Sequence, residues 1–144
     1  MMHEAVFEAK NNLERQLEAL HDDSLSEKAF LQLLCASEIF MPIQDDSTMG
    51  IQRSTSAKPL VVEDEGGIPV MLLFTSPERA KPVVQEFPGF AGGLLTEFKW
   101  VLEKIESDVG ISLNPGWEIG YDIEPETVKR LQADIRDVAA AVKD

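Results

Sequence analysis

A nearly continuous apolar segment, residues 68–74, limits the folds open to this chain more than any other feature. The segment reads Ile-Pro-Val-Met-Leu-Leu-Phe and lacks the alternation of a strand with one solvent-facing side. Such a run is typical of a central strand covered on both faces. A helix start follows at once, because Ser76 can cap a helix and Pro77 suits its first position. The segment therefore predicts a central strand that leads directly into a helix.

Helical spacing of apolar residues predicts further helices. They cover residues 3–20, residues 24–36, a longer stretch from residue 93 through Ile105, and a last helix that Pro125 opens and that reaches the C-terminus. In the second of these, Ser24 and Glu27 have the spacing of a capping box. We expect the first two helices to form an antiparallel hairpin and the last helix to be amphipathic.

Short apolar stretches predict the remaining strands. They cover residues 38–43, 60–62, 110–113 and 117–123, and a glycine-containing turn at 63–67 leads into the central strand. Residues 44–59 are polar and rich in Ser, Thr and Asp, which predicts a long, mobile loop. These elements predict one α+β domain over residues 1–144, with a helical extension at 1–23 and a core at 24–144.

The net charge of the chain limits the classes of partner that it can bind. It has 26 acidic and 13 basic residues, a formal net charge of −13. Binding to nucleic acid requires Lys and Arg to displace counterions, so we expect neither nucleic acid nor anionic lipid as a partner. A surface this negative attracts basic proteins instead. The sequence has no apolar run of about 20 residues and no secretory leader pattern, so we expect a soluble, cytoplasmic protein.

The residues that nucleophilic catalysis requires are scarce and scattered. Cys35, the single cysteine, lies in an apolar run, and the two histidines, His3 and His21, lie near the N-terminus. A nucleophile needs a base and an orienting group within reach, and the chain has no G-x-S-x-G segment. We therefore predict no catalytic residue and a protein that is not an enzyme.

Two further sequence patterns do not match the motifs of known ligand sites. Acidic clusters at residues 45–46, 63–65 and 122–126 offer oxygen ligands for a hard cation, but none has the spacing of a calcium loop. The glycines of residues 89–93 precede a predicted helix, yet their spacing matches no phosphate-binding motif. We predict solvated acidic turns and a flexible glycine turn, with no metal and no cofactor.

Aromatic residues in predicted loops are the strongest candidates for a binding surface. Phe90 and Trp117 each follow a Pro-Gly pair. Their rings either lap over the edge of the core or anchor a partner, since aromatic anchors dominate the energetics of interfaces. In the partner-binding hypothesis Phe90 and Trp117 are the anchors, and Glu63 and Glu65 belong to an acidic rim that speeds capture of a basic protein.

Three segments carry a resemblance to a known family. They are LFTSPERA at residues 73–80, LNPG at residues 113–116, and the polar strand that leads into Pro125-Glu126 and a helix containing Leu131. In this order and spacing they resemble the SseB N-terminal domain family of bacteria over roughly residues 26–131, with the N-terminal helix outside. The resemblance implies an α+β domain with a small mixed sheet packed with helices, and it implies no reaction.

These observations lead to an expected function of non-enzymatic protein binding by an acidic bacterial module. An immunity protein against a secreted toxin fits the size and charge, and a chaperone for a secreted effector fits them equally. The competing class is a small-molecule sensor or an enzyme linked to serine or amino-acid metabolism, which only the family name implies.

Overall fold

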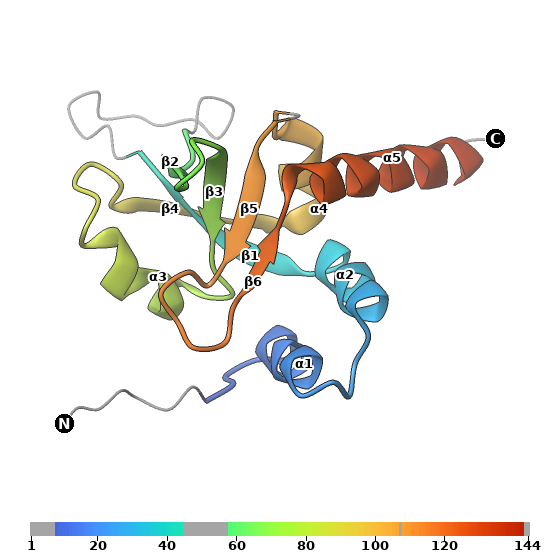
Figure 1. The fold of residues 1–144 in the computed structure, drawn as a ribbon, viewed down its shortest axis with the longest axis horizontal. Coiled ribbons are helices and arrows are strands. Elements are labelled where there is room, and N and C mark those ends of the chain that lie inside the picture. The colour runs from blue at the N-terminus through green and yellow to red at the C-terminus, as the bar shows by residue number, and fades with distance from the viewer. Residues whose placement is uncertain (1–7, 45–57, 107, 143–144) are drawn as a thin grey trace.

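Residues 8–44, 58–106 and 108–142 are described by the structure, which is a computed structural model (Figure 1). The helices are α1 (Asn12–His21), α2 (Glu27–Cys35), α3 (Pro77–Val84), α4 (Phe98–Lys104) and α5 (Pro125–Val142). The strands are β1 (Glu38–Ile43), β2 (Val61–Glu63), β3 (Pro69–Leu73), β4 (Gly92–Glu97), β5 (Gly110–Leu113) and β6 (Tyr121–Ile123). The predicted α+β fold class is confirmed.

The strands form two small sheets. The larger sheet has the order β2-β3-β5-β6, in which β3 and β5 are parallel and the other neighbours are antiparallel. The smaller sheet pairs β1 with β4 and contacts the larger one through a bridge between Phe40 and Phe74. The apolar segment at residues 68–74 thus supplies an inner strand, β3, of a mixed sheet, as its composition predicts.

The main hydrophobic core lies between the four-stranded sheet and four helices. Its fully buried residues include Leu17 of α1, Phe30 of α2, Leu102 of α4, Val128 of α5 and Leu73 of β3. Helices α1 and α2 also contact each other, which agrees with the expected N-terminal helical pair. The helix that was expected to extend beyond the core is therefore packed into it.

A smaller hydrophobic cluster lies on the opposite face of the sheet. Side chains alternate between the two faces along a strand, so Leu73 faces the main core while Leu72 and Phe74 face this second cluster. Ala80 of α3 and the ring of Phe90 pack against the same cluster. Helix α3 and the segment after it thus cover part of this face (Figure 1).

The prediction of a helix from residue 93 is wrong for its first turns. Residues 92–97 form β4, and α4 begins only at Phe98. Strand β4 pairs with β1 along its whole length, and the ring of Phe40 packs so closely on Gly93 that a Cβ there would lie 2.0 Å from Cζ. Glycine disfavours a helix, and the pairing with β1 settles the segment as a strand.

Both N-terminal helices begin later than predicted. Helix α1 begins after Asn11, whose side-chain oxygen accepts the N–H of Glu14 at 2.8 Å, and residues 8–10 are not helical. Helix α2 begins after Ser26, whose hydroxyl oxygen accepts a backbone N–H at 3.1 Å. The predicted capping box at Ser24 is therefore wrong by two residues.

The predicted strand over residues 117–123 is also shorter in the structure. Only Tyr121–Ile123 pairs with β5, and residues 117–120 form a loop. The loop forms because the indole of Trp117 packs against Arg79 rather than in a sheet. Residues 45–57 of the predicted long loop, including the acidic pair at 45–46, lie outside the described residues.

Candidate functional site

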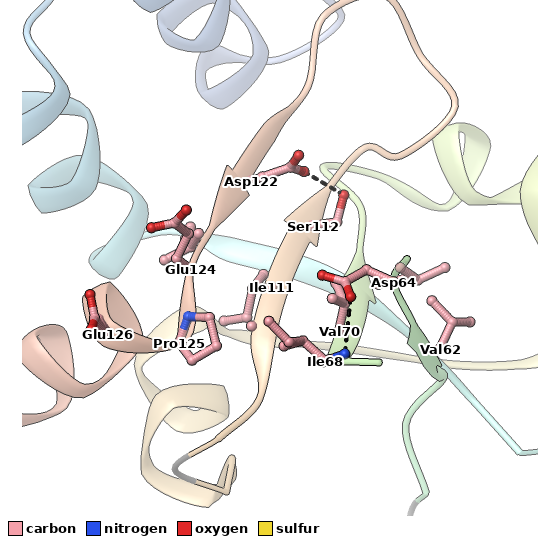
Figure 2. Close-up of a pocket in the computed structure, with 13 residues that line it drawn as sticks. Val62, Asp64, Ile68, Val70, Ile111, Ser112, Asp122, Glu124, Pro125 and Glu126 are labelled. Atoms are coloured by element: carbon pink, nitrogen blue, oxygen red, sulfur yellow. Dashed lines mark hydrogen bonds between the residues drawn. The ribbon is translucent and has the colours of Figure 1, made fainter. Parts of the chain in front are cut away.

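A groove of about 650 Å³ lies on the face of the four-stranded sheet that α3 leaves open (Figure 2). Residues of β2, β3, β5 and β6 line it, and Pro125 and Glu126 at the start of α5 border it. The core does not fill this groove, and it is the candidate site.

The strand register explains why the sheet is hollow at this point. Paired residues lie on one face of a sheet, and the register gives two cross-strand rows, Val62–Val70–Gly110 and Leu72–Ser112–Asp122. In both rows β5 contributes the small residue, Gly110 in the first and Ser112 in the second. Strand β5 therefore forms a low floor, and the larger side chains of the neighbouring strands project above it.

One side of the groove is apolar. Val62 and Val70 are half-buried members of the β2–β3 hairpin, and Ile68, which precedes β3, is 42% exposed. Asp64 lies among them, and its Oδ1 accepts the N–H groups of Gly66 at 2.8 Å and Ile68 at 3.0 Å. Asp64 thereby fixes the turn that presents Ile68 to the groove.

The other side of the groove is acidic. Asp122 of β6, Glu124 and Glu126 are all exposed and line it, and the Ser112 hydroxyl donates to Asp122 Oδ1 at 2.8 Å. Among the residues that the structure describes, no lysine, arginine or histidine lines the groove. The field in the groove is therefore negative, and it favours a cationic ligand.

The groove brings together two acidic clusters that are far apart in the sequence. Asp64 comes from the cluster at 63–65 and the other carboxylates come from the cluster at 122–126. Each cluster by itself predicts a solvated turn, and only the sheet places the two on one face. In the described part of the chain, no group of three or more potential ligands is arranged to hold a metal ion.

In the described part of the chain, none of the four residues assigned to partner binding lines the groove. Glu63 and Glu65 are exposed on either side of Asp64 in the hairpin. Phe90 is half-buried against the second hydrophobic cluster, which also contains groove residues of β2 and β3. Trp117 lies in the β5–β6 loop.

The structure separates Trp117 from the acidic hairpin. Because β3 and β5 are parallel, the turn before β3 and the loop after β5 lie at opposite ends of the sheet. Trp117 instead lines a second hollow of about 400 Å³ along the β5–β6 loop. The two hollows share Ser112 and Asp122, so the surface is continuous from the groove to Trp117.

Below this loop, the two motif segments at residues 73–80 and 113–116 meet α1 in a buried polar cluster of Glu14, Thr75, Arg79 and Asn114. Arg79 donates from Nε and Nη2 to the two carboxylate oxygens of Glu14, both at 2.9 Å. The hydroxyl of Thr75 also donates to Glu14. Asn114 donates from Nδ2 to Thr75 Oγ1 at 3.0 Å and accepts the Thr75 N–H, also at 3.0 Å.

Hydrogen bonding keeps both charges of this cluster in place. Burial raises the pKa of Glu14, but hydrogen bonds from Arg79, Thr75 and the backbone of Lys10 outweigh it, so that this pKa lies below its ordinary value. The hydrogen bond to Glu14 raises the pKa of Arg79. Glu14 is thus ionised with both oxygens bonded, an arrangement suited to holding α1 on the core rather than to proton transfer.

Trp117 covers this cluster. Its indole N–H donates to the Arg79 carbonyl oxygen at 2.7 Å, and the Arg79 guanidinium carbon lies 4.6 Å from the centre of its ring. The ring of Trp117 therefore contacts the protein itself at the edge of the core, as in the core-edge alternative.

At the far end of α2, Cys35 is half-buried, and burial raises the pKa of its thiol. This keeps the thiol protonated and unreactive at neutral pH.

The chain matches a known family across most of its length. The model of the SseB protein N-terminal domain matches residues 13–130, so the match begins inside α1 rather than near residue 26. No curated protein and no solved structure matches the chain. Among the helices in the described residues, none has the length and hydropathy of a membrane span.

Proposed function

The chain belongs to the SseB protein N-terminal domain family, and we propose that it is a non-enzymatic, acidic protein-binding module that captures a basic protein in its groove. The lining of the groove carries this proposal. It combines four carboxylates with apolar side chains and, within the described residues, includes no base. Apolar contacts hold a partner, while surrounding charges steer its approach.

The net charge of −13 supports the same proposal. Long-range attraction by a surface of one sign raises the association rate of an oppositely charged protein, and added salt weakens it. Glu65 is exposed in the turn beside Asp64 and adds negative charge there, whereas Glu63 follows Val62 in β2 and points to the opposite face of the sheet. Phe90 packs against the same hydrophobic cluster as Val62 and Val70 of the groove, and Trp117 lines the adjoining hollow. Both remain candidate anchors.

We propose two biological roles for such a module in the bacterial cytoplasm. An immunity protein would occupy and neutralise a basic toxin, whereas a chaperone would keep a basic effector soluble before secretion. The captured partner separates these roles. Co-expression with a toxin would restore growth in the first role, and co-expression with an effector would increase its soluble yield in the second.

The test is affinity capture from extracts of the native organism with three versions of the protein, followed by mass spectrometry. The groove variant combines Asp122→Asn, Glu124→Gln and Glu126→Gln. The control variant removes the same three charges at exposed positions outside the groove lining, by Glu86→Gln, Glu97→Gln and Glu103→Gln.

We expect the wild type and the control variant to capture the same basic protein and the groove variant to lose it. The association rate of the purified pair should fall on the order of tenfold in the groove variant and should decrease with added salt. Equal capture by all three versions would contradict the proposal, as would an association rate that does not depend on salt.

The size of the groove favours a second candidate function. A volume of about 650 Å³ falls within the range of small-molecule sites, about 300–1,000 Å³, and would suit a sensor or an enzyme linked to amino-acid metabolism. Thermal unfolding with lysine, arginine, serine and a nucleotide tests it. A melting temperature raised by one of these ligands in the wild type, and not in the groove variant, would favour this function.

A further inference from the structure

We infer that the groove binds one segment of the partner in a fixed orientation, with an apolar side chain against the β2–β3 hairpin and a lysine or arginine beside β6 and the start of α5. This inference rests on the proposed function, because it specifies the partner's chemistry at the same groove. It follows from the unequal chemistry of the two sides (Figure 2).

The apolar side has room for one more side chain. Ile68 is 42% exposed, and Val62 and Val70 are only half-buried although they belong to the edge of the second hydrophobic cluster. Beside them the floor is low, because Gly110 and Ser112 occupy the corresponding positions of β5. An aliphatic or aromatic side chain placed there would cover Ile68 and the floor at once, and removing this apolar surface from water is favourable.

The acidic side lacks a counter-charge. In the described part of the chain, the side chains of Glu124 and Glu126 form no hydrogen bond and no ion pair with the protein. Asp122, two residues before Glu124, accepts the Ser112 hydroxyl. A cation beside Asp122, Glu124 and Glu126 lowers the repulsion among their charges. Lysine and arginine suit this position because their aliphatic stems can lie along the apolar floor while the charged group reaches the rim.

Among the described residues that line the groove, Asp64 is the one carboxylate on the apolar side, and its hydrogen bonds give it a different role. Its Oδ1 already accepts two backbone N–H groups of the hairpin turn, from Gly66 and Ile68. Hydrogen bonds of this kind spread the negative charge into the turn. The strongest attraction for a cation therefore remains beside β6, and the orientation of the bound segment follows from it.

The test uses four capped six-residue peptides in a Gly-Ser background, with the central pairs Leu-Lys, Gly-Lys, Leu-Gly and Leu-Glu. Each is titrated into the full-length protein while backbone amide chemical shifts are recorded by NMR. We expect Leu-Lys to shift amides on both sides of the groove, at Val70 and at Glu124, and to bind about tenfold more tightly than Gly-Lys, a difference of about 1.4 kcal/mol. Leu-Glu should not bind.

A matched pair of variants locates the apolar contact. Ile68→Ser should remove the difference between Leu-Lys and Gly-Lys. Val61→Ser should preserve it, because Val61 is 40% exposed but pairs with Met71 on the opposite face of the sheet. Equal affinities of Leu-Lys and Gly-Lys for the wild type would overturn the inferred orientation and leave the proposed function intact. If neither cationic peptide shifts a groove amide, both the inference and the proposed function fail.

Discussion

The carboxylate of Glu14 and the guanidinium of Arg79 lie 65 residues apart in the sequence and face each other through two hydrogen bonds of 2.9 Å. Both side chains are buried, so each charge has lost its hydration and depends on the other. Thr75 and Asn114 complete the hydrogen bonding around them. The pair therefore joins α1 to the start of α3, beneath the loop that borders the candidate site.

Removing one partner of this pair should destabilise the protein strongly. We expect Glu14→Gln or Arg79→Met to lower the free energy of unfolding by about 3–5 kcal/mol, because each leaves an uncompensated buried charge or donor. Urea denaturation measures this loss. The exposed pair of Lys129 and Asp108, 3.7 Å apart, provides the control, and Lys129→Ala should change stability by less than about 1 kcal/mol. Similar losses in all three variants would contradict this account.

The same pair should make stability depend on pH. The pKa of Glu14 is lower in the folded protein than its ordinary value of 4.5, so the unfolded chain takes up this proton first as the pH falls. The contribution of Glu14 is therefore complete above about pH 5 and is lost as the pH falls below 4.5 toward the folded-state pKa. In urea titrations between pH 6 and 3, we expect the wild type to lose more stability than Glu14→Gln, and parallel curves would disprove this.

Local patterns in the sequence predict part of this fold correctly. The apolar run at residues 68–74 and the Ser76-Pro77 helix start give β3 and α3, because burial and capping act within a few residues. The prediction of a helix at residues 92–97 fails because their conformation depends on β1, which lies far away in the sequence. Without β1, the apolar spacing that continues into α4 favours a longer helix.

The candidate site depends even more on distant contacts. Gly110 and Ser112 are two residues apart in β5, and Asp122 follows in β6. The residues that shape the groove can therefore be read from the sequence. Only the register of β3, β5 and β6 shows that these residues form rows on the face away from the main core. The buried pair of Glu14 and Arg79 leaves no local pattern at all, because an acidic residue in a helix is ordinarily solvated.

Gly120 lies where the β5–β6 loop passes close to β5, and its replacement should disturb the loop. A Cβ at this position would lie 2.8 Å from the Leu113 carbonyl oxygen and 2.9 Å from that of Asn114. Backbone atoms have little room to yield, so Gly120→Ala should lower stability by about 1–3 kcal/mol. At Gly66 the nearest atom is 3.5 Å away, on the side chain of Asp64. Gly66→Ala should therefore change the melting temperature little, and equal shifts would count against the close approach at Gly120.

Trp117 should contribute to stability in two separable parts, through its hydrogen bond and through its ring. Trp117→Phe removes the N–H that donates to Arg79 but keeps an aromatic ring over the guanidinium, and should cost about 1 kcal/mol. Trp117→Ala also removes the ring 4.6 Å from the Arg79 guanidinium carbon and leaves a cavity, so its cost should reach about 3 kcal/mol. Urea denaturation of both variants gives these values, and equal losses would mean that the ring contributes nothing.

A role of Trp117 in binding requires a second measurement on the same variants. Trp117 lines the hollow that meets the groove at Ser112 and Asp122, so a partner seated in the groove can extend onto the indole. In that case Trp117→Ala should raise the dissociation rate of the captured partner, at a cost on the order of 2 kcal/mol. Its association rate should stay nearly unchanged, because it is the surrounding carboxylates that steer the approach. An unchanged dissociation rate per folded molecule, together with the stability loss, would restrict Trp117 to covering Arg79.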